Sequence, residues 1–144
     1  MKKEVLKIKI IDKEVGLPEY MNSGDVGFDL RAAENKKMLP GAEEVIKTGI
    51  IMEIPKGYVG LLRDRAGIVT KMNVHTVAGT FDSDYRGEVS VVLVNLNDDE
   101  VLIEKGMRIA QMIIIPILKP VIKEVKSLTE TKRGKKGFGS TGLK

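Results

Sequence analysis

The chain has 144 residues, no cysteine, no tryptophan and one histidine, which is the length of one domain and excludes thiol catalysis, disulfides and multi-histidine or cysteine-ligated metal sites. Carboxylates, hydroxyls, basic side chains and backbone amides remain for chemistry, with an oxygen-bound cation such as magnesium as a possible cofactor. The net charge of +4 suits an anionic partner but is too small to require a nucleic-acid groove.

A period of two in the apolar residues predicts short β-strands along most of the chain. Leu6, Ile8 and Ile10 alternate with lysines, which predicts a strand with one solvated face. A second strand is expected where one face is lined by Ile46, Thr48, Ile50, Met52 and Ile54 and the run stops at Pro55-Lys56-Gly57.

The second half of the chain continues the same pattern. Residues 89–96 are apolar at nearly every position, which predicts a strand that is covered on both faces. Further strands are expected over 101–103 and 109–115, and only residues 66–72 are compatible with a short helix. Many short strands with glycine and proline between them predict an all-β sandwich or barrel in one domain.

Targeting and membrane segments are not expected. The apolar run from Met112 to Leu118 is interrupted by Pro116 and is far shorter than the ~18 residues of a membrane helix. The basic N-terminus lacks the apolar core of a signal peptide. We therefore expect an intracellular protein that has no membrane partner.

The C-terminal segment from Lys126 is glycine-rich, basic and poor in apolar residues, so we expect it to be mobile on its own. Residues 137–142 satisfy G-x-G-x-x-G, but only two residues follow, so no helix can start there and a dinucleotide fold is excluded. Glycines and the nearby Arg133, Lys135 and Lys136 still suit a phosphate ligand. The alternative is a solvated basic tail.

Two other clusters have residue types that suit catalysis or phosphate binding. Asp82 and Asp84 point the same way if their segment is extended, so one can act as a base and the other can support it. An acidic turn is the alternative interpretation. Arg63 and Arg65 precede Gly67 at the expected helix start and form a candidate phosphate clamp, or a surface ion-pair cluster.

Five segments, in this order, resemble the five motifs of the trimeric dUTPases. They are Asp25-Val-Gly-Phe-Asp-Leu, Arg65-Ala-Gly, Gly79-Thr-Phe-Asp-Ser-Asp-Tyr-Arg-Gly, Gly106-Met-Arg-Ile-Ala-Gln, and Arg133-Gly with Gly137-Phe-Gly-Ser-Thr-Gly. The resemblance implies a distorted jelly-roll or β-barrel domain over 1–126 and a flexible tail over 127–144 that closes over the active site. It also implies a homotrimer with shared active sites that hydrolyses dUTP to dUMP and pyrophosphate with Mg²⁺.

The resemblance also implies roles for individual residues. Asp82 matches the carboxylate that activates the attacking water, and Asp29 matches one that supports the metal indirectly, through water. Tyr85 matches the residue beneath the sugar, and Phe138 the one that covers the base. The substrate-binding positions are Arg65, Ala66, Gly67, Gly79, Phe81, Tyr85, Gln111, Arg133, Phe138, Gly139, Ser140 and Thr141.

One departure from the family pattern bears on activity. The second motif usually reads Pro-Arg-Ser-Gly, and here it reads Asp64-Arg65-Ala66-Gly67. Without the serine hydroxyl one hydrogen bond to the phosphates is lost, so we expect a slowed enzyme. Two alternatives stay open, namely a dUTPase-like regulatory nucleotide-binding protein with weak catalysis and a relative of the dCTP deaminases. A basic nucleic-acid-binding barrel is disfavoured because the chain has only six Phe and Tyr residues.

Overall fold

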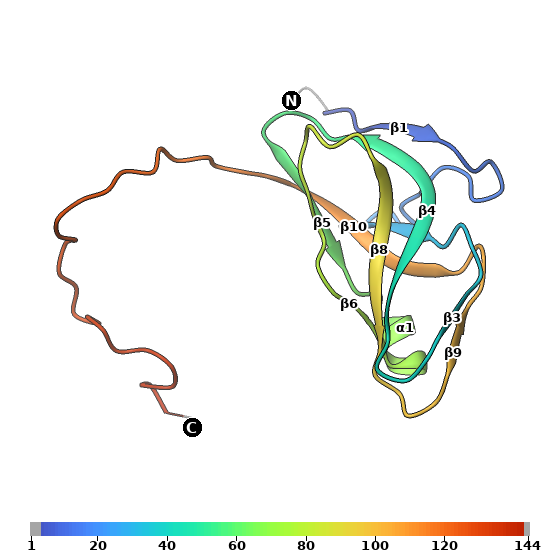
Figure 1. The fold of residues 1–144 in the computed structure, drawn as a ribbon. Coiled ribbons are helices and arrows are strands. Elements are labelled where there is room, and N and C mark those ends of the chain that lie inside the picture. The colour runs from blue at the N-terminus through green and yellow to red at the C-terminus, as the bar shows by residue number, and fades with distance from the viewer. Residues whose placement is uncertain (1–3, 143–144) are drawn as a thin grey trace.

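Antiparallel strands make up nearly all of the regular structure in the computed structural model, which describes residues 4–142 (Figure 1). In chain order the elements are β1 (Lys7–Ile10), β2 (Phe28–Arg31), β3 (Lys36–Met38), β4 (Glu43–Glu53), β5 (Tyr58–Arg63), α1 (Ala66–Met72), β6 (Val74–Thr76), β7 (Thr80–Phe81), β8 (Glu88–Asn95), β9 (Val101–Ile103) and β10 (Arg108–Pro116). The strand orders are β1-β4-β8-β6, β2-β10-β5-β7 and β3-β9. Buried side chains from all three sheets form one core, which confirms the predicted all-β class.

The face predicted for β4 is the one that the structure buries. Ile46, Thr48, Ile50, Met52 and Ile54 are each at most 4% exposed. The strand keeps this face inward despite a shift in its register with β8 between Lys47 and Ile51. Within that irregular stretch, Gly49 has a φ of +72°. Its position suits a β-bulge, where glycine relieves the strain of positive φ.

Two strands are less covered than their sequences predict. In β8, Val89, Val91 and Leu93 are buried, but the residues between them are half-buried, so the prediction of two covered faces is wrong for one chain. One face of β8 packs into the core, and residues 4–142 cover the other face only in part. In β1, Ile10 is 38% exposed because this short strand lies at the edge of its sheet.

The sequence patterns did not predict β2, β3, β5, β6 or β7, which have between two and six residues. β5 also contains Gly60, which interrupts its apolar alternation. A Cβ at Gly60 would lie 2.8 Å from Ile54 Cδ1 and 2.9 Å from Met112 Sδ, so packing explains the glycine. The helix matches its predicted range, 66–72, and ends at Asn73 in the left-handed conformation.

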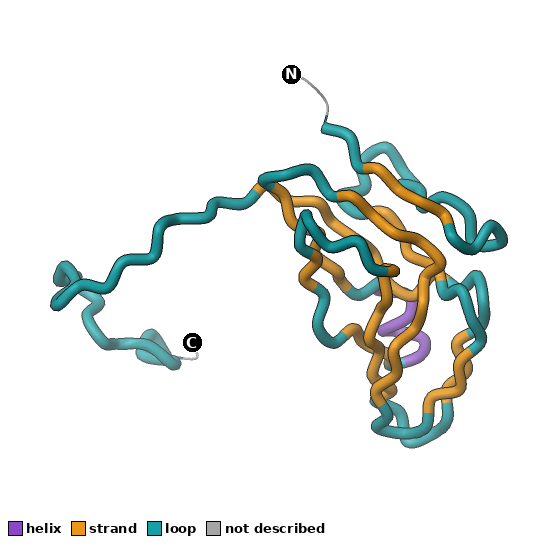
Figure 2. Tube along the Cα trace, turned by 45° about the horizontal axis from the view of Figure 1, so that its top comes forward, coloured by secondary structure: helices purple, strands orange, loops and turns teal. Residues whose placement is uncertain are grey.

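After β10 the chain leaves the body of the molecule (Figures 1 and 2). The Ile117 N–H donates to the Gly57 carbonyl at 2.9 Å, and residues 118–142 then contain neither helix nor strand. Leu118, Val121 and Ile122 are each at least 94% exposed. Within the described part of the chain, the one helix has seven residues and is too short to cross a membrane.

Candidate active site

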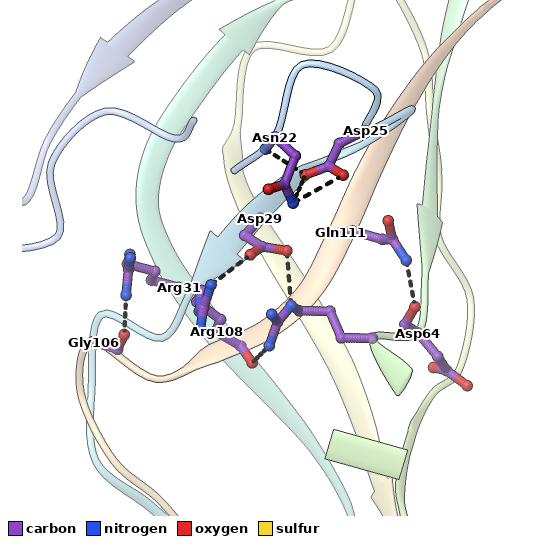
Figure 3. A network of polar contacts seen from close by, with 9 residues as sticks. Asn22, Asp25, Asp29, Arg31, Asp64, Gly106, Arg108 and Gln111 are labelled. Carbon is purple, nitrogen blue, oxygen red and sulfur yellow. Dashed lines mark hydrogen bonds and ion pairs between the residues drawn. The ribbon is translucent and has the colours of Figure 1, made fainter. Parts of the chain in front are cut away.

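Asp29 in β2 holds two arginines that come from different parts of the chain (Figure 3). Its Oδ1 accepts a hydrogen bond from Arg65 Nε at 2.8 Å, and its Oδ2 accepts one from Arg108 Nη1 at 3.4 Å. The Asp29 side chain is only 14% exposed. A carboxylate shielded from solvent in this way both neutralises the guanidinium groups and fixes their orientation.

The pairing of three strands explains why these residues meet. In β10, Gln111 lies opposite Asp29 of β2 on one side and opposite Arg63 of β5 on the other. Gln111 also donates from Nε2 to the carbonyl of Asp64 at 2.8 Å (Figure 3). The centre of the sheet therefore places Arg65, immediately after Asp64, beside the carboxylate of Asp29.

A pocket of about 510 Å³ opens above this network. It is lined by five of the residues that the sequence predicted for the site, namely Asp29, Arg65, Ala66, Gly67 and Gln111. The N–H groups of Ala66 and Gly67 belong to the first turn of α1, where a helix offers them no acceptor. The pocket thus combines guanidinium, amide and backbone N–H donors, which is the chemistry that binds phosphate oxygens.

The loop before β2 forms the opposite wall of the pocket. Asp25 accepts from the backbone N–H of Asn22 at 2.8 Å, so its carboxylate closes a turn. Gly27 is buried against β10. A Cβ there would lie 2.9 Å from Gln111 Oε1, so only glycine leaves the Gln111 side chain in place.

Asp64 is tied to β6 by its side chain. Its Oδ1 accepts from both the N–H and the hydroxyl of Thr76 at 2.6 Å, and its Oδ2 lies 3.1 Å from His75 Nδ1. Burial raises the pKa of Asp64, but the hydrogen bonds from Thr76 and His75 outweigh it and hold the pKa below the ordinary value of 3.8. Asp64 is therefore ionised at neutral pH.

The segment from Gly79 to Tyr85 forms a second group. The Gly79 carbonyl accepts from the N–H of Leu62 at 2.8 Å, and a Cβ on Gly79 would lie 2.5 Å from Leu62 Cβ, so glycine is required here. Phe81 pairs with Gly60 of β5, and its ring centroid lies 6.2 Å from that of Tyr85. Asp82 follows β7 directly and is exposed to solvent.

Within one chain, the predicted site residues fall into three separate groups. Asp82 and Tyr85 do not line the 510 Å³ pocket. Gly60, which pairs with Phe81, and Arg63, which pairs with Gln111, are three residue steps apart, or about 10 Å along the strand. The tail residues form the third group. Arg133 Nε donates to the Lys136 carbonyl at 3.0 Å, and Phe138 is fully exposed. Gly139, Ser140 and Thr141 lie in turns of the same segment, away from the body (Figure 1).

Two residues of the network are absent from the predicted site. Arg108 lies within the fourth motif segment, so its basic side chain beside Gly106 was an available signal. Asp64 had no comparable signal, because only the fold brings Thr76, twelve residues later, against its carboxylate.

Comparisons with known proteins point to one family. The dUTPase family model matches residues 13–142. A deoxyuridine 5'-triphosphate nucleotidohydrolase of Clostridium tetani is 44% identical over 144 residues, covering 99% of each chain. The structure of Staphylococcus bacteriophage 80alpha dUTPase with dUPNHPP, reported among phage dUTPases that control transfer of virulence genes, aligns with a TM-score of 0.92 and 32% identity, covering 98% of this chain and 100% of that one. A mutant dUTPase from phage phi11 of S. aureus, reported with a structural Mg(II) ion, aligns with a TM-score of 0.82 and 25% identity, covering 88% and 100%.

Replacing Asp29 tests its role as the shared acceptor of the network. We expect Asp29→Ala to lower the free energy of unfolding by about 1–3 kcal/mol, because two guanidinium groups lose a shielded charged acceptor. Urea unfolding at one fixed protein concentration measures the change. The matched control is Asp98→Ala, which removes an exposed carboxylate from a loop. Equal, small effects of the two substitutions would contradict the role given to Asp29.

Proposed function

The chain belongs to the dUTPase family and is a dUTP diphosphatase, and we propose that it hydrolyses dUTP at a composite site built from the three groups described above. The observation that carries this assignment is the convergence of Asp29, Arg65, Ala66, Gly67 and Gln111 on one pocket. The resemblance that the sequence motifs suggested is confirmed at the level of the family.

The 510 Å³ pocket is the proposed site of the triphosphate. Arg65 and Gln111 are the proposed side-chain contacts to phosphate oxygens, and the first-turn N–H groups of Ala66 and Gly67 provide two more donors. A Cβ at Gly67 would meet no atom within 4 Å in the free chain. The fold of the free chain therefore does not require glycine at this position, and we propose that the ligand approaches it closely.

Asp82 is the proposed base. Its carboxylate accepts a proton from a water molecule while the water oxygen attacks phosphorus. The bond between the α- and β-phosphates then breaks, and the products are dUMP and pyrophosphate. The exposure of Asp82 in the free chain is consistent with a base that meets its water only when a substrate and neighbouring subunits enclose it.

The hairpin around Gly79 is the proposed nucleoside site. Backbone groups of Gly79 and Phe81 are proposed to read the edge of uracil, where a methyl group at C5 would clash. Tyr85 is proposed to pack beneath the sugar and to exclude a 2′-hydroxyl. Its ring is fixed by the hydrogen bond from its hydroxyl to the Glu88 carbonyl, at 3.2 Å, and by Gly87, where a Cβ would lie 2.2 Å from the tyrosine oxygen. A site that rejects other nucleotides by shape and also pairs polar groups with the correct base is the most selective arrangement.

The donor set of the pocket fits a magnesium ion that arrives with the substrate. Within residues 4–142, no three carboxylate or imidazole side chains converge on one point. Both oxygens of Asp29 already accept from arginines. Asp29 would therefore act on the ion through water, and phosphate oxygens and water would supply the other ligands, as this ion prefers. When bound, the ion neutralises charge on the phosphates.

We propose that the active molecule is a homotrimer whose sites are shared. The three groups of site residues do not meet in one chain, and a contribution from another subunit to each site would bring them together. The apolar side chains of Leu118, Val121 and Ile122 are almost fully exposed in one chain, and burial against a neighbouring subunit would stabilise them. The boundary between the domain over 1–126 and the tail over 127–144 stays a prediction, because residues 118–126 already lie outside the body of one chain.

Pyrophosphate release from dUTP, dTTP, dCTP and UTP tests the proposed function. We expect release from dUTP alone and no release of ammonia from dCTP.

Asp82→Asn should lower turnover by about 100-fold or more, because a general base contributes 10²–10⁴-fold, while binding of a non-hydrolysable dUTP analogue is kept. The control is Asp84→Asn, which removes the neighbouring carboxylate. Binding of dUTP without turnover in the unmodified chain would favour the regulatory alternative, and an unchanged rate in Asp82→Asn would refute the role of Asp82.

Restoring the family's serine tests the account of the second motif. We expect Ala66→Ser to raise kcat by roughly tenfold or more, the effect of one hydrogen bond to a charged group worth about 1.5–3 kcal/mol. Steady-state pyrophosphate release measures the change. The matched control is Ala42→Ser, which adds the same hydroxyl at the turn before β4 and should leave kcat unchanged. No increase in Ala66→Ser would show that this chain does not use the missing hydroxyl.

A further inference from the structure

Asp64 occupies the junction between the two phosphate-contacting residues of the pocket. Its backbone carbonyl accepts from Gln111 at 2.8 Å, and the next residue along the chain is Arg65. The carboxylate of Asp64 points away from Asp29, toward the opposite side of the loop (Figure 3). This follows from the extended backbone at Arg65, with φ −93° and ψ 131°, because consecutive side chains of an extended segment point in opposite directions.

The partners of that carboxylate belong to a well-anchored strand. Thr76 donates both its N–H and its hydroxyl to Asp64 Oδ1, and His75 Nδ1 lies 3.1 Å from Oδ2. In β6, Thr76 pairs with Leu93 of β8, which is fully buried in the core. The side chain of Asp64 therefore connects the loop before α1 to a strand that pairs with the core strand β8.

The hydrogen bonds of the Asp64 carboxylate to Thr76 and His75 hold this loop on the side of β6. Within the described residues, the start of α1 at Arg65 has no side-chain cap. The guanidinium of Arg65 itself is bound from the other side, by Asp29 and by the Arg108 carbonyl. Position 64 usually carries proline in the family motif, a residue that restricts the backbone by itself. Here hydrogen bonds to β6 do the restricting.

From these contacts we infer that Asp64 is a positioning residue. Through its side-chain hydrogen bonds to Thr76 and His75, it holds Arg65 and Gln111 at the distance and direction needed to bind the triphosphate. The inference rests on the proposed role of Arg65 as a phosphate contact. Asp64 itself does not touch the substrate. Its carboxylate is directed away from the pocket, whose lining includes Arg65 and Gln111 but not Asp64.

A double-mutant cycle separates positioning from general stability. The variants are Asp64→Ala, Arg65→Ala and the double variant, each assayed for the dissociation constant of a non-hydrolysable dUTP analogue and for inhibition by deoxyuridine, which has no phosphate. We expect Asp64→Ala to weaken binding of the analogue by about tenfold, the effect of one misplaced charge-assisted contact, and to leave deoxyuridine within about twofold. In the Arg65→Ala background, Asp64→Ala should weaken binding of the analogue less than it does in the unmodified chain, because only the Gln111 contact is left to be misplaced.

Conservative variants keep the test decisive if Asp64→Ala does not fold. Asp64→Asn retains an oxygen that can accept from Thr76, so it should keep most of the affinity for the analogue. Thr76→Val removes the hydroxyl alone, so it should lower that affinity only in part. Asp98→Ala is the unaffected control. If Arg65→Ala weakens binding of the analogue and Asp64→Ala does not, this inference is overturned but the phosphate role of Arg65 stands. If Arg65→Ala leaves binding of the analogue unchanged, the phosphate role of Arg65 is itself refuted. Equal weakening of the analogue and deoxyuridine, additive with Arg65→Ala, would show a merely structural role and would also overturn the inference.

Discussion

The carboxylate of Asp29 is the contact on which the candidate site depends. It lies in β2, the edge strand beside β10, is 14% exposed, and accepts from Arg65 and Arg108 at the same time. Two like charges brought together at a pocket would repel each other and disorder the loop that carries Arg65. With the shared acceptor in place, both guanidinium groups have fixed directions and Arg65 remains beside the backbone donors of the α1 start.

The fold places this contact through the pairing of β10 with two neighbours. Gln111 lies opposite Asp29 on one side and Arg63 on the other, so one strand sets the position of three motifs. Glycines allow the close packing that this requires. Gly27 leaves room for the Gln111 side chain, and Gly60 leaves room for the Phe81 side of the sheet, where the nucleoside site is proposed. The phosphate and nucleoside sites thus share β5 as a common support.

The sequence predicted the long elements and the family, but not the contacts that organise the site. The alternation from Ile46 to Ile54 is strong enough to predict a buried face. The short helix was also predicted over the residues where it is found, 66–72. β7 has only two residues, and its pairing with Gly60 depends on tertiary structure. The hydrogen bonds from Thr76 to Asp64 and from Arg65 to Asp29 join residues that are distant in the sequence. Local sequence patterns do not specify such contacts.

The central claim is that one chain supplies only part of each active site, and complementation between inactive variants tests it most directly. Subunits carrying Asp82→Asn are to be mixed and reassembled with subunits carrying Arg133→Ala and Phe138→Ala, and pyrophosphate release from dUTP measured. Each variant alone should be nearly inactive. If Asp82 and the tail come from different subunits, random trimers should have about one quarter of their sites intact, so activity should return on mixing. Reassembled mixed trimers that stay as inactive as the separate variants would contradict the shared site.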